Sequence, residues 1–232
     1  MYNRILLKLS GALFTKTNQK GIDYETLYSV AVQIKEIIKT GVQISIVVGG
    51  GNFWKRKENK GLETVCSDNI GMLATIMNAL ALQDVLEKNG IKSIVQSDVH
   101  IPKITTQNDY KTNNELLEKD AVIIFAGGMS NPFFKTDTAA VIRALETKSD
   151  IVMLAKKIDA IYTKNPNVHK DAKKIEKITY DQVLEKQMHV IEEQAILLAK
   201  EWKIPIKIFG IKEENSILKA VVTNKEIGTL IN

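Results

Sequence analysis

Short apolar runs alternate with longer amphipathic stretches along most of this chain, and that order restricts its fold more than any other feature. The apolar runs, each predicted to be a strand, are residues 5–9, 42–48, 91–95, 122–126, 151–154, 206–209 and 229–231. The amphipathic stretches predict helices over about 23–40, 67–89, 137–145, 180–185 and 192–202. This alternation predicts a three-layer α/β/α sandwich around a mainly parallel sheet. We expect a single domain over residues 1–232, whose part from about 157 to 232 forms a looser lobe.

The composition is that of a globular protein with a large core, because 44% of the 232 residues are hydrophobic and 25% are charged. The single cysteine, Cys66, cannot pair within the chain, so a reducing compartment fits best. A strand-like run follows the first four residues and leaves no room for a signal peptide. The longest weakly polar stretch, 71–82, contains Asn78 and is shorter than the ~20 residues of a membrane span. We expect a cytoplasmic protein without a membrane partner.

The net charge of +5 fits either a polyanion partner or lysines spread over a solvated surface. Arginine is scarce and the basic residues form no long run, which favours the second interpretation and predicts no nucleic-acid partner. His100, His169 and His189 lie far apart without the spacing of a metal site, so we expect no metal-ligating residues.

Three predicted strands end in glycine: at Gly11, at the triplet 49–51, and at the pair 127–128. Ligands bind beyond the carboxyl ends of the strands in an open parallel sheet. Glycine at that edge lets backbone N–H groups approach a phosphate closely. One such glycine is explained by an ordinary turn, but three loops, one of them a triplet, favour phosphate binding.

Two known phosphate-binding motifs are absent, and their absence limits which kind of phosphate-binding fold this chain can have. No glycine is followed by lysine, so the P-loop is missing, and Trp54 stands where a dinucleotide motif requires its third glycine. A cation for the phosphates must therefore come from elsewhere, and Lys8 is the candidate. Lys8 could be an edge-strand lysine facing water. Its apolar neighbours instead indicate a central strand, where a charge without a function would be costly.

Four segments carry a specific resemblance: KLSG at 8–11, GGGN at 49–52, DNIGMLAT at 68–75 and NPFFKTD at 131–137. Together they closely resemble the bacterial UMP kinases of the amino acid kinase family. The likeness runs in order from about residue 3 to the segment 228–231, nearly the whole chain. It implies transfer of the γ-phosphate of ATP to UMP in pyrimidine nucleotide synthesis, with Mg²⁺ bound through the ATP phosphates.

The resemblance implies that Lys8 stabilises charge on the transferred group, and that Asp137 orients Lys8 and the phosphates. The residues implied to bind ATP are Lys8, Leu9, Ser10, Gly11, Gly51, Lys55, Lys156, Tyr162 and Asn165, the last two near adenosine. The residues implied to bind UMP are Gly50, Asp68, Met129, Ser130, Asn131, Pro132, Phe133, Phe134, Lys135 and Thr136, with Asp68 at the ribose hydroxyls.

This chain departs from the family pattern at several of these positions. Lys55, beside Arg56, stands where the family usually has arginine, and lysine keeps the charge but not the bidentate fork. Either Lys55 or Arg56 could meet the phosphate. The other departures are Met129 and Lys135 for hydroxyl residues, Lys156 for threonine, and Asn165 for aspartate.

Simpler interpretations of the same residues stay open. Asp68 and Asp137 could each be no more than a helix N-cap, with Ser67 as an alternative cap, and Phe133 and Phe134 could be core residues. Two other functions also fit part of the pattern: a kinase of this fold with an acyl or carbamoyl acceptor, and a non-catalytic nucleotide sensor. The segment 131–137 argues against the first, and the joint presence of Lys8 and Asp137 argues against the second.

The resemblance also implies a homohexamer that GTP activates and UTP inhibits. Apolar residues over more than one face of the predicted helix 67–89 favour self-association, namely Met72, Ile76, Met77, Leu80 and Leu82. Gln83 stands where the family often places arginine, and a triphosphate site needs cations. We expect a hexamer with weak or absent GTP activation, in which UTP competes at the UMP site.

Overall fold

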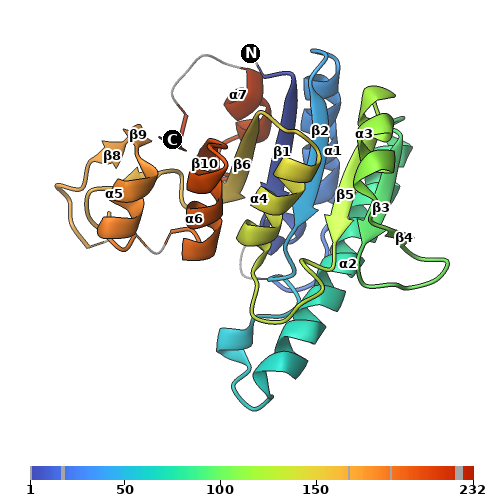
Figure 1. Cartoon of the computed structure of the whole chain (residues 1–232), viewed down its shortest axis with the longest axis horizontal. Coiled ribbons are helices and arrows are strands. Elements are labelled where there is room, and N and C mark those ends of the chain that lie inside the picture. Colours follow the sequence, from blue (N-terminus) through green and yellow to red (C-terminus); the bar gives the residue numbers. More distant parts are fainter. Residues whose placement is uncertain (1, 17–18, 167, 189, 223–226) are drawn as a thin grey trace.

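The computed structural model describes residues 2–16, 19–166, 168–188, 190–222 and 227–232. Within them, nine strands form one sheet in the order β4-β3-β5-β2-β1-β6-β10-β11-β9 (Figure 1). Their bounds are β1 (Arg4–Leu9), β2 (Gln43–Val48), β3 (Ser93–Ser97), β4 (Thr106–Gln107), β5 (Val122–Ala126), β6 (Ile151–Lys156), β9 (Lys177–Ile178), β10 (Ile206–Gly210) and β11 (Thr229–Ile231). Neighbouring strands are parallel except for β10 and β11. A separate antiparallel pair joins β7 (Ile161–Tyr162) to β8 (Lys174–Ile175).

Helices cover both faces of the sheet, as the three-layer prediction requires (Figure 1). One apolar core joins the sheet to α1 (Tyr24–Ile38), α2 (Thr64–Lys88) and α7 (Ser216–Val222). The other core joins it to α3 (Tyr110–Glu118), α4 (Thr136–Glu146), α5 (Tyr180–Glu185) and α6 (Glu193–Glu201). β1 supplies Leu7 to the first core and Leu6 to the second, because successive side chains of a strand point to opposite faces.

Most predicted elements are present, and their differences from the prediction have local causes. β5, α5 and β11 have the predicted bounds, whereas β3 begins two residues later than expected. The predictions omitted α3, α7 and the two-residue strands β4, β7, β8 and β9. α3 has a polar sequence and buries only Asn113 and Leu117, so its apolar periodicity is weak.

The start of α2 was predicted wrongly. The helix begins at Thr64, before both residues proposed as its cap. Ser67 and Asp68 lie inside the helix, where they serve contacts with other segments: Ser67 Oγ accepts from Trp54 Nε1, and Asp68 accepts from the Phe133 N–H. Neither residue is therefore an N-cap.

α2 is longer than its sequence suggested, with 25 residues. Among the described helices it alone has the length and hydropathy that could cross a membrane. It packs against the sheet through side chains such as Ile76 and Leu82, and it buries the polar side chains of Thr75 and Asn78. Its first turns extend past the carboxyl edge of the sheet (Figure 1).

Candidate active site

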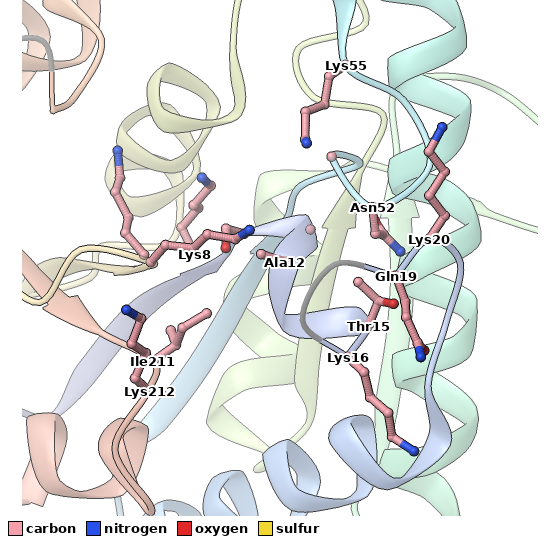
Figure 2. A pocket seen from close by; sticks show the side chains of 15 residues that line it. Lys8, Ala12, Thr15, Lys16, Gln19, Lys20, Asn52, Lys55, Ile211 and Lys212 are labelled. Atoms are coloured by element: carbon pink, nitrogen blue, oxygen red, sulfur yellow. The ribbon is translucent and has the colours of Figure 1, made fainter. Parts of the chain in front are cut away.

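A cavity of about 570 Å³, here called the Lys8 pocket, opens at the carboxyl end of β1. The glycine loops contribute Ser10, Gly11, Gly51 and Asn52 to its wall. Lysines dominate the rest of the lining: Lys8, Lys16, Lys20, Lys55, Lys156, Lys157 and Lys212. Figure 2 shows Ile211 and Lys212 on the wall facing Thr15, Gln19 and Asn52. A cavity surrounded by cations and backbone amides suits a polyphosphate ligand.

Lys8 and Lys156, which line this pocket, form a buried cluster with a third charged side chain, Asp137. Lys8 points to the face of the sheet that α4 covers, and its Nζ lies 2.9 Å from Asp137 Oδ1. Lys156, at the end of β6, places its Nζ 2.6 Å from Asp137 Oδ2 and donates a second hydrogen bond to Val190 O. The parallel pairing of β1 with β6 sets Lys8 opposite Leu154, so Lys8 and Lys156 point to the same face of the sheet and meet the two oxygens of one carboxylate.

The cluster keeps its carboxylate ionised. Burial alone would raise the pKa of Asp137, but the Lys8 and Lys156 ammonium groups outweigh it and hold the pKa well below its usual range. Burial is also the main reason why the pKa of Lys156 is lowered, against the opposing effect of Asp137. The cluster carries a net positive charge in a nearly dry site, which attracts an anion.

Both simpler interpretations of Lys8 and Asp137 are wrong in this structure. β1 lies between β2 and β6 and not at an edge, and Lys8 is only 7% exposed. Lys135 occupies the N-cap position of α4, and Asp137 lies in the first turn with its carboxylate turned to the two lysines.

The first two glycine loops touch each other beside this cluster. A Cβ on Gly11 would lie 2.4 Å from the backbone nitrogen of Gly51, so only glycine lets the loops approach so closely. Gly49 N–H donates to Leu9 O at 2.8 Å. Ser10 Oγ is buried and has no protein partner, which leaves its hydroxyl available to a ligand oxygen.

A second cavity, here called the Asp68 pocket, adjoins the first and has a volume of about 350 Å³. Gly50 lines it, whereas Gly51 lines the Lys8 pocket, and Lys55 lines both. The other described residues around it are Trp54, Arg56, Lys57, Ser67, Asp68, Gly71, Met72, Thr75, Gly128, Asn131, Phe134, Lys135 and Thr136. The glycine triplet thus separates two neighbouring sites.

Asp68 has partners at the mouth of its pocket. Arg56 Nη1 lies 2.7 Å from Asp68 Oδ2, and the Phe133 N–H donates to the same oxygen at 2.8 Å. Lys55 instead pairs with Glu58, an exposed contact that costs little to break. Of the two basic residues, Arg56 is held at Asp68, and Lys55 borders both cavities.

The loop between β5 and α4 lines one side of the Asp68 pocket and has a strained backbone. Ser130 and Phe133 have positive φ of 56° and 75°, which non-glycine residues adopt at an energetic cost. Phe133 and Phe134 are 65% and 51% exposed, so the core interpretation of these rings is wrong. Ser130 Oγ is buried without a protein partner. Backbone strain clusters at functional sites, and a buried hydroxyl without a protein partner can bond to a ligand.

Several predicted binding residues lie outside the two cavity linings. Leu9 is fully buried in β1, and Met129 packs against the core beside α4. Tyr162, in β7, donates to Asp159, and neither it nor Asn165 is among the described residues that line the Lys8 pocket. Their assignment to adenosine stays a prediction. His189 lies outside the described residues.

The structure adds site residues that the sequence did not reveal. Trp54 and Ser67 line the Asp68 pocket, and Ile211 lines the Lys8 pocket together with Thr15, Lys16, Gln19 and Lys20. Ile211 and Lys212 follow β10 at the carboxyl edge of the sheet, so their position after a predicted strand could have identified them. Asn52, another lining residue, follows the glycine triplet in the same way.

Known proteins share this architecture over the whole chain. The profile of the amino acid kinase family matches residues 3–210. The UMP kinase of Bacillus anthracis superposes with a TM-score of 0.95 at 31% identity, covering 100% of this chain and 96% of that one. The UMP kinase of Ureaplasma parvum gives 0.93 at 32% identity, covering 100% and 99%. The uridylate kinase of Archaeoglobus fulgidus, at 23% identity and a TM-score of 0.71, shares the fold over 98% of this chain and 99% of its own. The chain belongs to the amino acid kinase family.

Proposed function

We propose that this protein transfers the γ-phosphate of ATP to UMP, giving UDP and ADP in pyrimidine nucleotide synthesis. One observation carries the proposal: two adjoining cavities share the glycine triplet, and Lys8 and Lys156, both paired with the buried Asp137, line one of them. Phosphoryl transfer needs a donor and an acceptor held in line and charge stabilisation between them. The likeness to two bacterial UMP kinases supports UMP as the acceptor.

The Lys8 pocket would hold ATP and the Asp68 pocket UMP. Lys8, Lys156 and the amides of the first two glycine loops would bind the donor phosphates, with the Ser10 hydroxyl as a further donor. Asp68 would accept hydrogen bonds from the ribose hydroxyls, in exchange for its contact with Arg56. Residues 129–136 would enclose uracil and the acceptor phosphate. In this arrangement residues 157–232 form the ATP-side lobe of a single domain.

The residues support direct transfer between the two nucleotides. Lys8 and Lys156 would stabilise negative charge as it develops on the transferred group, while Asp137 fixes their positions. A phosphate monoester dianion is itself a competent nucleophile, so no general base and no covalent phospho-enzyme are required. The proton balance of the reaction then involves no side chain.

Magnesium fits this site as a partner of the nucleotide. Among the described residues, no three histidine, cysteine, aspartate or glutamate side chains gather into a cluster that could hold a metal. The carboxylate at the phosphate site, Asp137, faces two lysines. Mg²⁺ commonly binds through substrate phosphates with few protein ligands, and it would neutralise charge on the β- and γ-oxygens.

We further propose a cytoplasmic homohexamer with weak or absent GTP activation and with UTP competing for the UMP site. α2 leaves Val65, Leu73 and Met77 about half exposed, which favours a partner on that face, whereas Ile76 and Leu82 belong to the core. The Gln83 amide donates to Ser93 O and to Glu87, so it is already engaged within the protein.

A coupled assay with ATP·Mg²⁺ tests the function directly. UMP is expected to be phosphorylated in preference to CMP, AMP and GMP, and aspartate, N-acetylglutamate and carbamate are expected to be inactive. Lys8→Met should abolish most turnover, while Lys39→Met, at an exposed lysine of the C-terminus of α1, should leave it unchanged. Phosphorylation of a carboxylate or carbamate would establish the first alternative function. Nucleotide binding without transfer to any acceptor would establish the sensor.

A further inference from the structure

Two buried asparagines face each other beneath the glycine triplet. Asn52 follows the triplet and Asn78 lies on α2, and they are 5% and 0% exposed. Each amide donates to the other: Asn52 Nδ2 lies 2.9 Å from Asn78 Oδ1, and Asn78 Nδ2 lies 2.7 Å from Asn52 Oδ1. A buried amide is costly unless its hydrogen bonds are made, so this reciprocal pair specifies one arrangement.

The remaining N–H groups of the pair hold two loops of the Lys8 pocket. Asn78 Nδ2 donates to Gly49 O at 2.7 Å, which fixes the start of the triplet. Asn52 Nδ2 donates to Gly21 O at 2.8 Å, and Gly21 N–H donates back to Asn52 O. These contacts hold Gly21, and with it the neighbouring Gln19 and Lys20, close to the triplet, on the wall of the pocket where Figure 2 shows Asn52.

The same pair also sets the position of the first glycine loop. A Cβ on Gly11 would lie 2.8 Å from Asn52 Oδ1, so Gly11 packs directly on the amide. Asn78 is therefore linked to Gly11 through Asn52, although it lines neither cavity itself. A displaced amide would move the N–H groups that face the donor phosphates.

Thr75, one turn before Asn78 on α2, holds the third glycine loop. Its Oγ1 accepts from Gly127 N–H at 2.7 Å and donates to Met72 O, and the residue is 4% exposed. Gly127 precedes the loop that encloses the Asp68 pocket. Two neighbouring side chains of one helix thus anchor different loops. The triplet also borders the Asp68 pocket through Gly50, but Gly50 is held there by its own close packing on Ala74 and Gly71 of α2, where an added Cβ would lie 2.8 Å from each.

We propose that α2 positions the two substrate sites separately: Asn78, through its pair with Asn52, positions the ATP-phosphate loops, and Thr75 positions the UMP loop. The identity of the substrates in this inference rests on the proposed function. Asn52, Asn78 and Thr75 are positioning residues. A displacement of about 1 Å at a reacting group can lower the rate by about 10²-fold, so loss of either anchor should be visible in kinetics.

The test compares Asn78→Leu with Thr75→Val, two substitutions that keep the number and branching of the side-chain heavy atoms and remove the anchoring groups. Calorimetry measures the Kd of ADP and of UMP, and steady-state kinetics measure kcat and both KM values. Asn78→Leu should weaken ADP binding and lower kcat by about 10–100-fold, with the Kd of UMP within about twofold. Thr75→Val should weaken UMP binding and leave the Kd of ADP unchanged. Asn89→Ala, which removes an amide contact at the C-terminus of α2, should change neither.

A structural role alone would give a different pattern. The inference would be overturned if the variants changed the thermal unfolding temperature but neither Kd nor kcat. It would also be overturned if both variants lost ADP and UMP binding equally. If Asn78→Leu does not fold, Asn52→Ala takes its place and must weaken the binding of ADP but not that of UMP. Equal effects on the binding of both ligands would refute the inference. A wild-type protein that binds ADP but never phosphorylates UMP would refute the proposed function, while ADP binding by the Asn78 and Asn52 variants would still decide this inference.

Discussion

Replacing Asp137 by asparagine should destabilise the protein strongly, because it removes the counter-charge of two buried lysines. The side chains of Lys8 and Lys156 are 9% and 15% exposed and lie 2.9 and 2.6 Å from the carboxylate. Removing one partner of a buried ion pair costs about 3–5 kcal/mol, mostly because the other charge stays buried and unpaired. We expect Asp137→Asn to lose stability in this range at pH 7.

The loss should depend on pH with a definite sign. In the wild type the pKa of Asp137 is lowered, so its contribution to stability is complete above about pH 4 and is lost as the pH falls further. In the variant, Lys156 loses the charge that opposes the effect of its burial, so its folded pKa falls further below the unfolded value of about 10.4. The unfolded chain then binds more protons, so the variant gains stability as the pH rises towards 10.

Urea unfolding followed by tryptophan fluorescence at pH 7 and pH 9.5 measures both effects. The deficit of Asp137→Asn should be smaller at the higher pH, and the double variant Asp137→Asn/Lys156→Met should recover part of it at pH 7. Asp84→Asn, which breaks an exposed pair with Lys88, should change the free energy of unfolding by less than about 0.5 kcal/mol. A deficit below about 1 kcal/mol at both pH values would refute the buried-cluster reasoning.

Four further outcomes are expected. Lys8→Ala should lower kcat by roughly 10²–10³ with little change in the KM for UMP, and an unchanged kcat in steady-state assays would make Lys8 a structural residue. UMP should be preferred over dUMP and the preference lost in Asp68→Asn, whereas equal wild-type turnover of the two nucleotides would remove Asp68 from the ribose. Because the pKa of Lys156 is lowered, the alkaline fall in kcat should begin at a lower pH than the titration of an ordinary lysine. In a pH–rate profile, Lys156→Arg should shift this alkaline fall to higher pH. Light scattering should report a hexamer, and initial rates at sub-saturating UMP should change little with GTP. A strong GTP effect that is lost on mutation of α2 would show that Gln83 does not prevent activation.

The sequence alone was sufficient for the layers of the fold. Apolar periodicity is a local property, and it located the longer strands of the sheet and also β11, with β5 and β11 at their observed bounds. It also placed Lys8 in a central strand and three glycine loops at the carboxyl edge, since parallel strands bring their ends together there. The resemblance to the amino acid kinase family came from short motifs in the same loops and is confirmed by the comparisons.

Contacts between distant side chains were decided by the tertiary structure. The sequence named Lys156 and Asp137 separately, but their ion pair depends on how β6 lies beside β1 and α4. The start of α2 was missed for the same reason, because Ser67 and Asp68 look like caps until Trp54 and Phe133 are placed beside them. Asn78 read as a polar interruption of an apolar helix until Asn52 was found against it. Periodicity records which face of an element is buried, whereas the partner of a polar side chain depends on strand order and loop path, which no local pattern contains.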